Sequence, residues 1–198
     1  MAKAKIKTPE IEDARAALLA QARAAFANGG SAAVEVVPIC KAAGLTTGAL
    51  YHHFGNRNGL LRAVVEAVAE SVAAKAAKAM EGIDDDWEQL RAGVHCVLDC
   101  CLEDEVRVTY NEAPSIVGLD EWRRIEESKT GALLVTTLLR LQKDGLLKPL
   151  SLELLAAMVK GAIVEGAMTI TRSSKPKRTR AEAGELLDAL LESVRRRS

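Results

Sequence analysis

Residues 44–54, which read Gly-Leu-Thr-Thr-Gly-Ala-Leu-Tyr-His-His-Phe, constrain the fold of this chain more than any other stretch. Gly44 is suited to close a preceding helix, because the left-handed conformation that ends many helices costs glycine little. Thr46 is a good N-cap for a following helix. At about 100° per residue, Leu50 and Phe54 then point together toward the interior. The pattern predicts the turn and the second helix of a helix-turn-helix.

The opposite side of this predicted helix carries small and polar side chains. Gly48 and His52 lie four residues apart and face away from the interior, with Ala49 and Tyr51 on the flanks. Glycine inside a helix costs about 1 kcal/mol relative to alanine, so Gly48 indicates a packing or functional reason. Close approach to a DNA backbone or to a base edge is one such reason.

The longer stretch of residues 39–60 resembles the DNA-binding head of the TetR family of bacterial repressors. The family pattern runs Ile-Ala-x-x-Ala-Gly-Val-Ser-x-Gly-x-Leu-Tyr-x-His-Phe-x-Ser-Lys-x-x-Leu. This chain reads Ile-Cys-Lys-Ala-Ala-Gly-Leu-Thr-Thr-Gly-Ala-Leu-Tyr-His-His-Phe-Gly-Asn-Arg-Asn-Gly-Leu, without a gap. The resemblance implies that Thr46, Tyr51 and Arg57 hold phosphates, that Thr47, Gly48, Ala49 and His52 approach base edges, and that His53 does one or the other. A hydroxyl residue that often touches a phosphate in the family is missing, because Val36, Val37 and Pro38 occupy its region.

Composition favours an all-α protein, since Ala, Leu and Val are abundant and aromatic residues make up only 3% of the chain. We expect about nine helices in two domains. Residues 1–55 would form a homeodomain-like head of three helices, and residues 56–198 a helical domain for effector binding and dimerisation. Eight cations and four anions fall within residues 1–62, so this part is +4 and the rest is −4. A basic head on an acidic body is typical of a nucleic-acid module joined to another module.

Several classes of protein are disfavoured by the sequence. No uninterrupted apolar run approaches the ~20 residues of a membrane span, and no apolar core follows the N-terminal lysines as in a signal peptide. We therefore expect a cytoplasmic protein without membrane contact, whose four cysteines are mostly reduced. The chain carries no Gly-rich phosphate loop, nucleophile elbow or metalloprotease spacing. An enzyme is not predicted, and neither is a cofactor or a metal.

Two pairs of residues on the predicted helix of residues 85–102 leave alternatives open. Cys96 and Cys100 are four residues apart, and so are His95 and Asp99. These side chains either pack or line a pocket, because buried free cysteine behaves as a small hydrophobe, or they sense thiol oxidation or a metal. One helix cannot aim all four at a single ion.

A stretch around Pro114 and Gly118 interrupts the helical periodicity between residues 103 and 120. Residues 110–122 resemble, more weakly than the head does, a stretch of one TetR subgroup. The segment is either a broken helix that borders a ligand pocket or a surface loop anchored by Trp122. The candidate ligand-binding residues of the whole chain are Trp87, His95, Cys96, Cys100, Tyr110, Asn111, Trp122 and Glu165.

The last two predicted helices each carry one apolar stripe, so they are expected to form a four-helix bundle with their copies in a homodimer. The basic run of residues 173–180 between them is either a solvated connector or a nucleic-acid contact. The candidate dimerisation residues are Leu155, Val159, Ala162, Gly166, Leu187, Leu190, Leu191 and Val194.

Together these features favour a dimeric repressor that binds a near-palindromic double-stranded operator and releases it when an unknown small-molecule effector binds the C-terminal domain. The alternative is a thiol- or metal-responsive regulator with the same head, which senses through Cys96 and Cys100.

Overall fold

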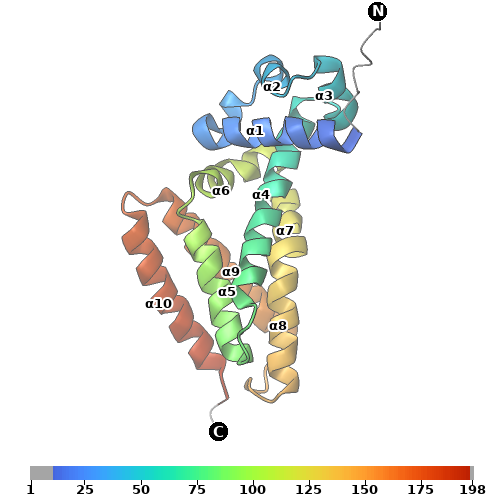
Figure 1. The fold of residues 1–198 in the computed structure, drawn as a ribbon. Helices are drawn as coiled ribbons and strands as arrows, with labels where there is room; N and C mark the ends of the chain where they lie inside the picture. The colour runs from blue at the N-terminus through green and yellow to red at the C-terminus, as the bar shows by residue number, and fades with distance from the viewer. Residues whose placement is uncertain (1–10, 197–198) are drawn as a thin grey trace, which may run out of the picture. The chain divides into compact units, whose positions relative to one another are not determined.

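The computed structural model describes residues 11–196, and within them the chain is all-α (Figure 1). Ten α-helices and one π-helical segment fall in this range, and the only β-like feature within it is an isolated bridge between Leu147 and Arg195. The chain divides into two compact units, Met1–Val64 and Val65–Ser198. The division lies inside α4 (Arg57–Met80), whereas the sequence placed it just before that helix, between residues 55 and 56.

The first unit is built on the long helix α1 (Ile11–Ala33), with α2 (Val36–Ala42) and α3 (Thr47–Phe54) packed against it (Figure 1). Leu18, Ala22 and Phe26 are spaced four residues apart along α1 and are fully buried, as expected for an apolar stripe. The backbone leaves helical geometry at Gly29 and Gly30, where Gly30 has φ of 66°. The sequence predicted the end of the first helix at this point.

The turn between α2 and α3 has the expected geometry. Gly44 adopts φ of 67°, in the left-handed region that favours glycine. Thr46 is the N-cap of α3, and its Oγ1 accepts a hydrogen bond of 3.2 Å from the Ala49 amide. Leu50 is fully buried and anchors α3 to the other helices of the unit. A three-helix helix-turn-helix is therefore present.

The second unit contains the rest of α4 and the helices α5 (Asp86–Cys100), α6 (Asp104–Val117), α7 (Leu119–Glu126), α8 (Ala132–Lys143), α9 (Leu152–Arg172) and α10 (Pro176–Val194). The π-helical segment η1 (Glu127–Gly131) joins α7 to α8, so residues 119–143 form one long helical run (Figure 1). The sequence predicted one helix from Trp122 to about Asp144. When this run is counted as one helix, residues 11–196 contain the expected nine. α10 packs along α5 and α9.

Two parts of the second unit differ from the prediction. The surface-loop interpretation of residues 103–120 is wrong, because α6 is a helix of 14 residues that contains Pro114 near its end. The proline costs α6 one backbone hydrogen bond, since it has no N–H to donate to the carbonyl four residues back, but it does not end the helix there. The basic run of residues 173–180 is not all a connector, because α10 begins within it at Pro176. Proline is well tolerated at the first position of a helix, since the N–H it lacks would have no partner there.

One helix of the described residues, α9, is long and apolar enough to cross a membrane by length and composition alone, with a mean hydropathy of 1.5. Charged residues interrupt it, so no uninterrupted apolar run reaches that length. α9 packs against α5, α6, α8 and α10. Of its apolar stretch, 28% is buried in the structure.

Candidate functional site

The first candidate site is the outward face of α3. Thr46, Thr47, Gly48, Tyr51 and His52 are exposed, while Ala49 and His53 are half-buried. Tyr51 is an aromatic side chain with 51% of its surface exposed. The face that the sequence predicted for DNA contact is thus available within its unit, and its contact with DNA stays a prediction.

The anchored side of α3 is completed by ring contacts. The rings of His53 and Phe54 meet edge to face with centroids 6.3 Å apart. The Arg15 guanidinium lies 5.3 Å from the centroid of the Phe54 ring, a distance typical of cation–π contacts. Phe54 is half-buried, so α1 covers the second of the two predicted inward side chains.

Arg57 has a structural role that the sequence did not suggest. Its Nε donates a hydrogen bond of 2.7 Å to the Val34 carbonyl oxygen, and its Nη2 donates to the Ser31 carbonyl oxygen. Both carbonyls lie where the backbone turns from α1 to α2, and the guanidinium ties this turn to the start of α4. The phosphate contact of Arg57 stays a prediction, and any such contact would have to use a guanidinium that is already engaged.

The second candidate site is a cavity of about 50 Å³ in the unit of residues 65–198, with walls drawn from α4 to α9. Most of the lining is apolar. The polar members are Tyr110, Glu126, Thr130, Thr137 and Lys160, and the others are Ala76, Met80, Leu90, Gly93, Val94, Val97, Gly131, Leu133, Leu134, Ile163 and Val164.

Glu126 is the most unusual residue of this lining, because this acidic residue is only 5% exposed. The Tyr110 hydroxyl donates a hydrogen bond of 3.0 Å to Glu126 Oε2, and Thr130 Oγ1 lies 3.5 Å from the same oxygen. Burial raises the pKa of Glu126 to about 7, against the opposing effect of these two hydroxyls. Burial and the nearby Glu126 carboxylate raise the pKa of Tyr110 well above 10. The cluster therefore has a carboxyl group that changes charge near neutral pH.

Of the eight residues predicted to bind a ligand, only Tyr110 lines the cavity. Trp122 lies behind it, with its ring edge-to-face against Tyr110 at 5.3 Å. Asn111 and Glu165 are exposed on helix surfaces. Sequence reasoning missed the polar lining residues Glu126, Thr130, Thr137 and Lys160. One signal was present, since Glu126 follows Trp122 by four residues and therefore shares the face of a large apolar side chain.

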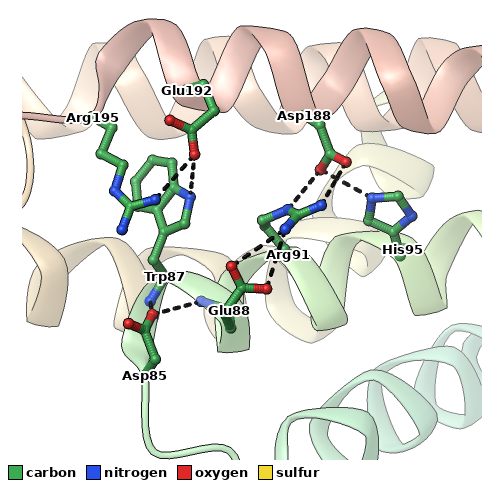
Figure 2. A network of polar contacts seen from close by, with 8 residues as sticks. All are labelled: Asp85, Trp87, Glu88, Arg91, His95, Asp188, Glu192 and Arg195. Atoms are coloured by element: carbon green, nitrogen blue, oxygen red, sulfur yellow. Dashed lines mark hydrogen bonds and ion pairs between the residues drawn. The ribbon is translucent and has the colours of Figure 1, made fainter. Parts of the chain in front are cut away.

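Trp87 and His95 hold α5 to α10 (Figure 2). The Trp87 Nε1 donates a hydrogen bond of 2.9 Å to Glu192 Oε1, and the Arg195 guanidinium lies 4.9 Å from the Trp87 ring centroid. His95 Nε2 lies 3.0 Å from Asp188 Oδ1. These two residues were predicted to bind a ligand, and in the structure their polar atoms are engaged by α10.

The hydrogen bonds around His95 assign its tautomer. Arg180 Nη2 lies 3.1 Å from His95 Nδ1, and because a guanidinium can only donate, Nδ1 must accept. The proton of neutral His95 is then on Nε2, which donates to Asp188. Arg91 also donates to Asp188, through Nε at 3.1 Å and Nη2 at 2.9 Å. This pairing with Arg91, with His95 next in importance, lowers the pKa of Asp188 to about 2.

The cysteines of α5 and its C-cap have the character of packed side chains. Burial raises the pKa of Cys96, and it raises the pKa of Cys100 and Cys101 to about 12. The thiolate is the reactive and metal-binding form, so high pKa values work against both chemistries. Residues 11–196 contain no group of three or more His, Cys, Asp and Glu side chains placed to hold a metal. The alternative of thiol or metal sensing through Cys96 and Cys100 finds no support.

The third feature is an apolar groove of about 330 Å³ between α9 and α10. Leu154, Met158 and Leu190 line it and are 61%, 67% and 54% exposed. Seven of the eight residues predicted to form a dimer line this groove: Leu155, Val159, Ala162, Leu187, Leu190, Leu191 and Val194. The eighth, Gly166, faces inward, because a Cβ built on it would meet Leu98 at 3.9 Å.

A capped helix-turn-helix joined to a separate all-helical unit with an internal cavity defines a class of DNA-binding regulators. Comparison with family models agrees with this class. Residues 18–64 match the model for bacterial regulatory proteins of the tetR family, and residues 87–194 match the tetracyclin repressor-like C-terminal domain. The chain belongs to the TetR family of transcriptional regulators.

Solved structures show the same fold. A TetR-family regulator from Pectobacterium atrosepticum is 28% identical, with a TM-score of 0.79 over 96% of this chain and 99% of that one. RolR, solved in complex with resorcinol, is 21% identical, with a TM-score of 0.70 over 93% and 89% of the two chains. A regulator from Marinobacter aquaeolei is 21% identical, with a TM-score of 0.66 over 94% and 97%. No curated protein matches this chain.

Proposed function

We propose that this regulator is a homodimeric repressor that binds a near-palindromic operator through α3 and releases it when a small molecule enters the cavity lined by α4 to α9. The observation that carries the proposal is the outward face of α3, where small and hydrogen-bonding side chains stand exposed on a helix anchored by Leu50. A recognition helix of this kind enters the major groove and contacts base edges near its N-terminus. Thr47, Gly48 and His52 would make the base contacts, and Thr46 and Tyr51 the phosphate contacts.

The apolar groove of α9 and α10 supports a dimer. Exposed leucine and methionine side chains along two adjacent helices are an unusual surface for a soluble chain to leave in water. A second copy that packs its own α9 and α10 there forms a four-helix bundle and buries this surface. Two heads related by the two-fold axis of such a dimer match two half-sites of a near-palindrome.

The cavity and α4 support control by an effector. α4 is one continuous helix from Arg57 to Met80, whose first turns belong to the head and whose Ala76 and Met80 line the cavity. If a ligand binds the cavity more tightly when α4 is in one of two positions, it shifts the population of molecules toward that position. The size of the shift is set by the difference between the affinities of the ligand for the two states. RolR, which shares the fold, holds the small aromatic diol resorcinol.

The test is to select genomic DNA fragments with the purified full chain and to sequence them. We expect enrichment of a short inverted repeat and its protection by one dimer in footprinting. Affinity should fall steeply with salt, because phosphate contacts release counterions. Fragments that share no repeat, or a bound complex that contains a single copy of the chain, would contradict the proposal.

A further inference from the structure

The cavity contains one cluster of polar groups against a largely apolar wall. At its centre is the Glu126 carboxyl, with the Tyr110 hydroxyl 3.0 Å and the Thr130 hydroxyl 3.5 Å from Oε2. The Tyr110 hydroxyl donates to this oxygen, whereas the single hydroxyl proton of Thr130 has a nearer acceptor in the Glu126 backbone carbonyl oxygen, at 3.2 Å. Among residues 11–196, no hydrogen bond to Oε1 accompanies them, so one acceptor of a carboxyl group that lines the cavity remains unused by the protein.

A structural reason for this carboxyl group is hard to find. Burying an ionisable group costs stability unless it is paired with an opposite charge. The Glu126 carboxyl is held by the neutral Tyr110 hydroxyl, with the Thr130 hydroxyl farther away. Lys160, the one cation that residues 11–196 place in the cavity wall, lies 3.4 Å from the Glu127 carboxylate instead. A leucine or glutamine at this position would fill the space at a lower desolvation cost. Such a costly group in a cavity wall indicates a ligand rather than packing.

One side chain of the cavity wall is able to move and make room for a ligand. The cavity of about 50 Å³ has room for little more than water as it stands. Met80 Sδ occupies the space over Gly93, 2.9 Å from where a Cβ would be. Methionine has three rotatable side-chain bonds and adapts easily. Rotation of Met80 would enlarge the cavity without displacing a helix.

We propose that the ligand of this cavity is a small, uncharged, mostly apolar molecule whose hydroxyl group donates a hydrogen bond to Glu126, which is the residue that determines specificity. The inference rests on the proposed function, since it names the chemical class of the effector. A hydrocarbon would leave the carboxyl acceptor unpaired once water is excluded. A charged ligand would have to bury its charge in a wall that is mostly apolar, which costs more than burying a hydroxyl group.

The experiment compares three probes of similar shape, namely phenol, toluene and benzylamine, by calorimetric titration of the full chain at neutral pH. We expect phenol to bind about tenfold more tightly than toluene, and benzylamine to bind more weakly than phenol. Equal binding of phenol and toluene, tightest binding of benzylamine, or no binding of any probe at millimolar concentration would each overturn the proposal.

Variants test whether the preference for phenol over toluene depends on Glu126. Glu126→Leu should abolish the preference for phenol over toluene, while Glu126→Gln, which keeps a carbonyl acceptor, should retain part of it. The matched control is Glu153→Leu, which makes the same change at an exposed glutamate that does not line the cavity. It should leave the preference unchanged. A preference that survives in Glu126→Leu would also overturn the proposal.

The same probes, added to a complex with the selected operator fragment, separate this inference from the proposed function. Phenol binding that depends on Glu126 but leaves DNA bound would contradict effector release and leave the ligand class standing. DNA release by toluene as readily as by phenol would support effector release and contradict the ligand class.

Discussion

At the scale of single residues, Glu126 shows how burial alone changes the chemistry of a side chain. Its pKa is raised to about 7 in the folded protein from 4.5, so the folded state holds this proton more tightly than the unfolded state does. The stability contribution is therefore complete below about pH 4.5 and is lost as the pH rises toward 7. The shift corresponds to about 3 kcal/mol.

Replacing Glu126 by glutamine should remove this pH dependence. Urea unfolding of the wild type between pH 4.5 and 7.5 should show stability falling as the pH rises, and Glu126→Gln should show a flatter profile. Tyr110 and Cys101, which face the carboxyl group, do not titrate in this window, because their pKa values lie well above it. Parallel profiles for the two proteins would mean that Glu126 is not the group responsible.

His52 and Arg57 should behave differently when each is changed to alanine. His52 is exposed on α3, so its loss should change the preferred operator sequence and shift stability by less than about 0.5 kcal/mol. Arg57 holds the Ser31 and Val34 carbonyls, so its loss should lower stability by about 1–3 kcal/mol and weaken binding to all sequences.

Binding isotherms at several salt concentrations would then decide whether Arg57 also holds a phosphate. A flatter salt dependence in Arg57→Ala indicates a lost phosphate contact, whereas weaker binding with an unchanged slope indicates that Arg57 acts only through the shape of the head. Unchanged affinity and an unchanged sequence preference in both variants would contradict the contacts proposed for α3.

At the scale of elements, α5 and α10 are held together by polar contacts as well as by apolar packing. Asp188 of α10 accepts hydrogen bonds from Arg91 and His95 of α5, and this pairing lowers its pKa to about 2 from 3.8 (Figure 2). A lowered carboxyl pKa means that the stabilisation is present above about pH 3.8 and is lost as the pH falls toward 2.

Asp188→Asn should therefore destabilise the protein at neutral pH. Arg91 is partly exposed, so solvent screening reduces the effect, and we expect a loss of about 1 kcal/mol. Chemical denaturation at neutral pH measures it, with Asp84→Asn as a control in an exposed turn. Equal stability of Asp188→Asn and the control would show that apolar packing alone sets this helix pair.

At the scale of the whole molecule, the groove of α9 and α10 is the feature that a single copy leaves unexplained. Leu190→Glu places a charge on a side chain that is 54% exposed and lines this groove. If a second copy covers the groove, the variant should sediment as a monomer and bind the operator at least tenfold more weakly, since burying an unpaired charge is costly. Leu119→Glu, at a leucine 51% exposed outside the groove, is the matched control. A dimer of normal affinity for Leu190→Glu would move the interface elsewhere.

Helix ends and anchored faces were predictable from the sequence because a few adjacent residues encode them. Gly44, Thr46 and Leu50 specify the turn, the cap and the buried side of α3 by their spacing alone, and the structure confirms each. The error at residues 103–120 has a local origin too, since Pro114 was taken as the point where a helix breaks, whereas it lies in the last turn of α6.

The chain by itself thus determined the class of fold, the recognition helix and the apolar stripes of α9 and α10, because local sequence carries helix periodicity and capping. Only the tertiary structure decided which side chains surround the cavity. Trp87 and His95 contact α10, whereas Tyr110 of α6 and Glu126 of α7 meet in the cavity wall. Periodicity tells which face of a helix is buried, but only the packing of that helix against its neighbours determines whether the buried face meets another side chain or an open space.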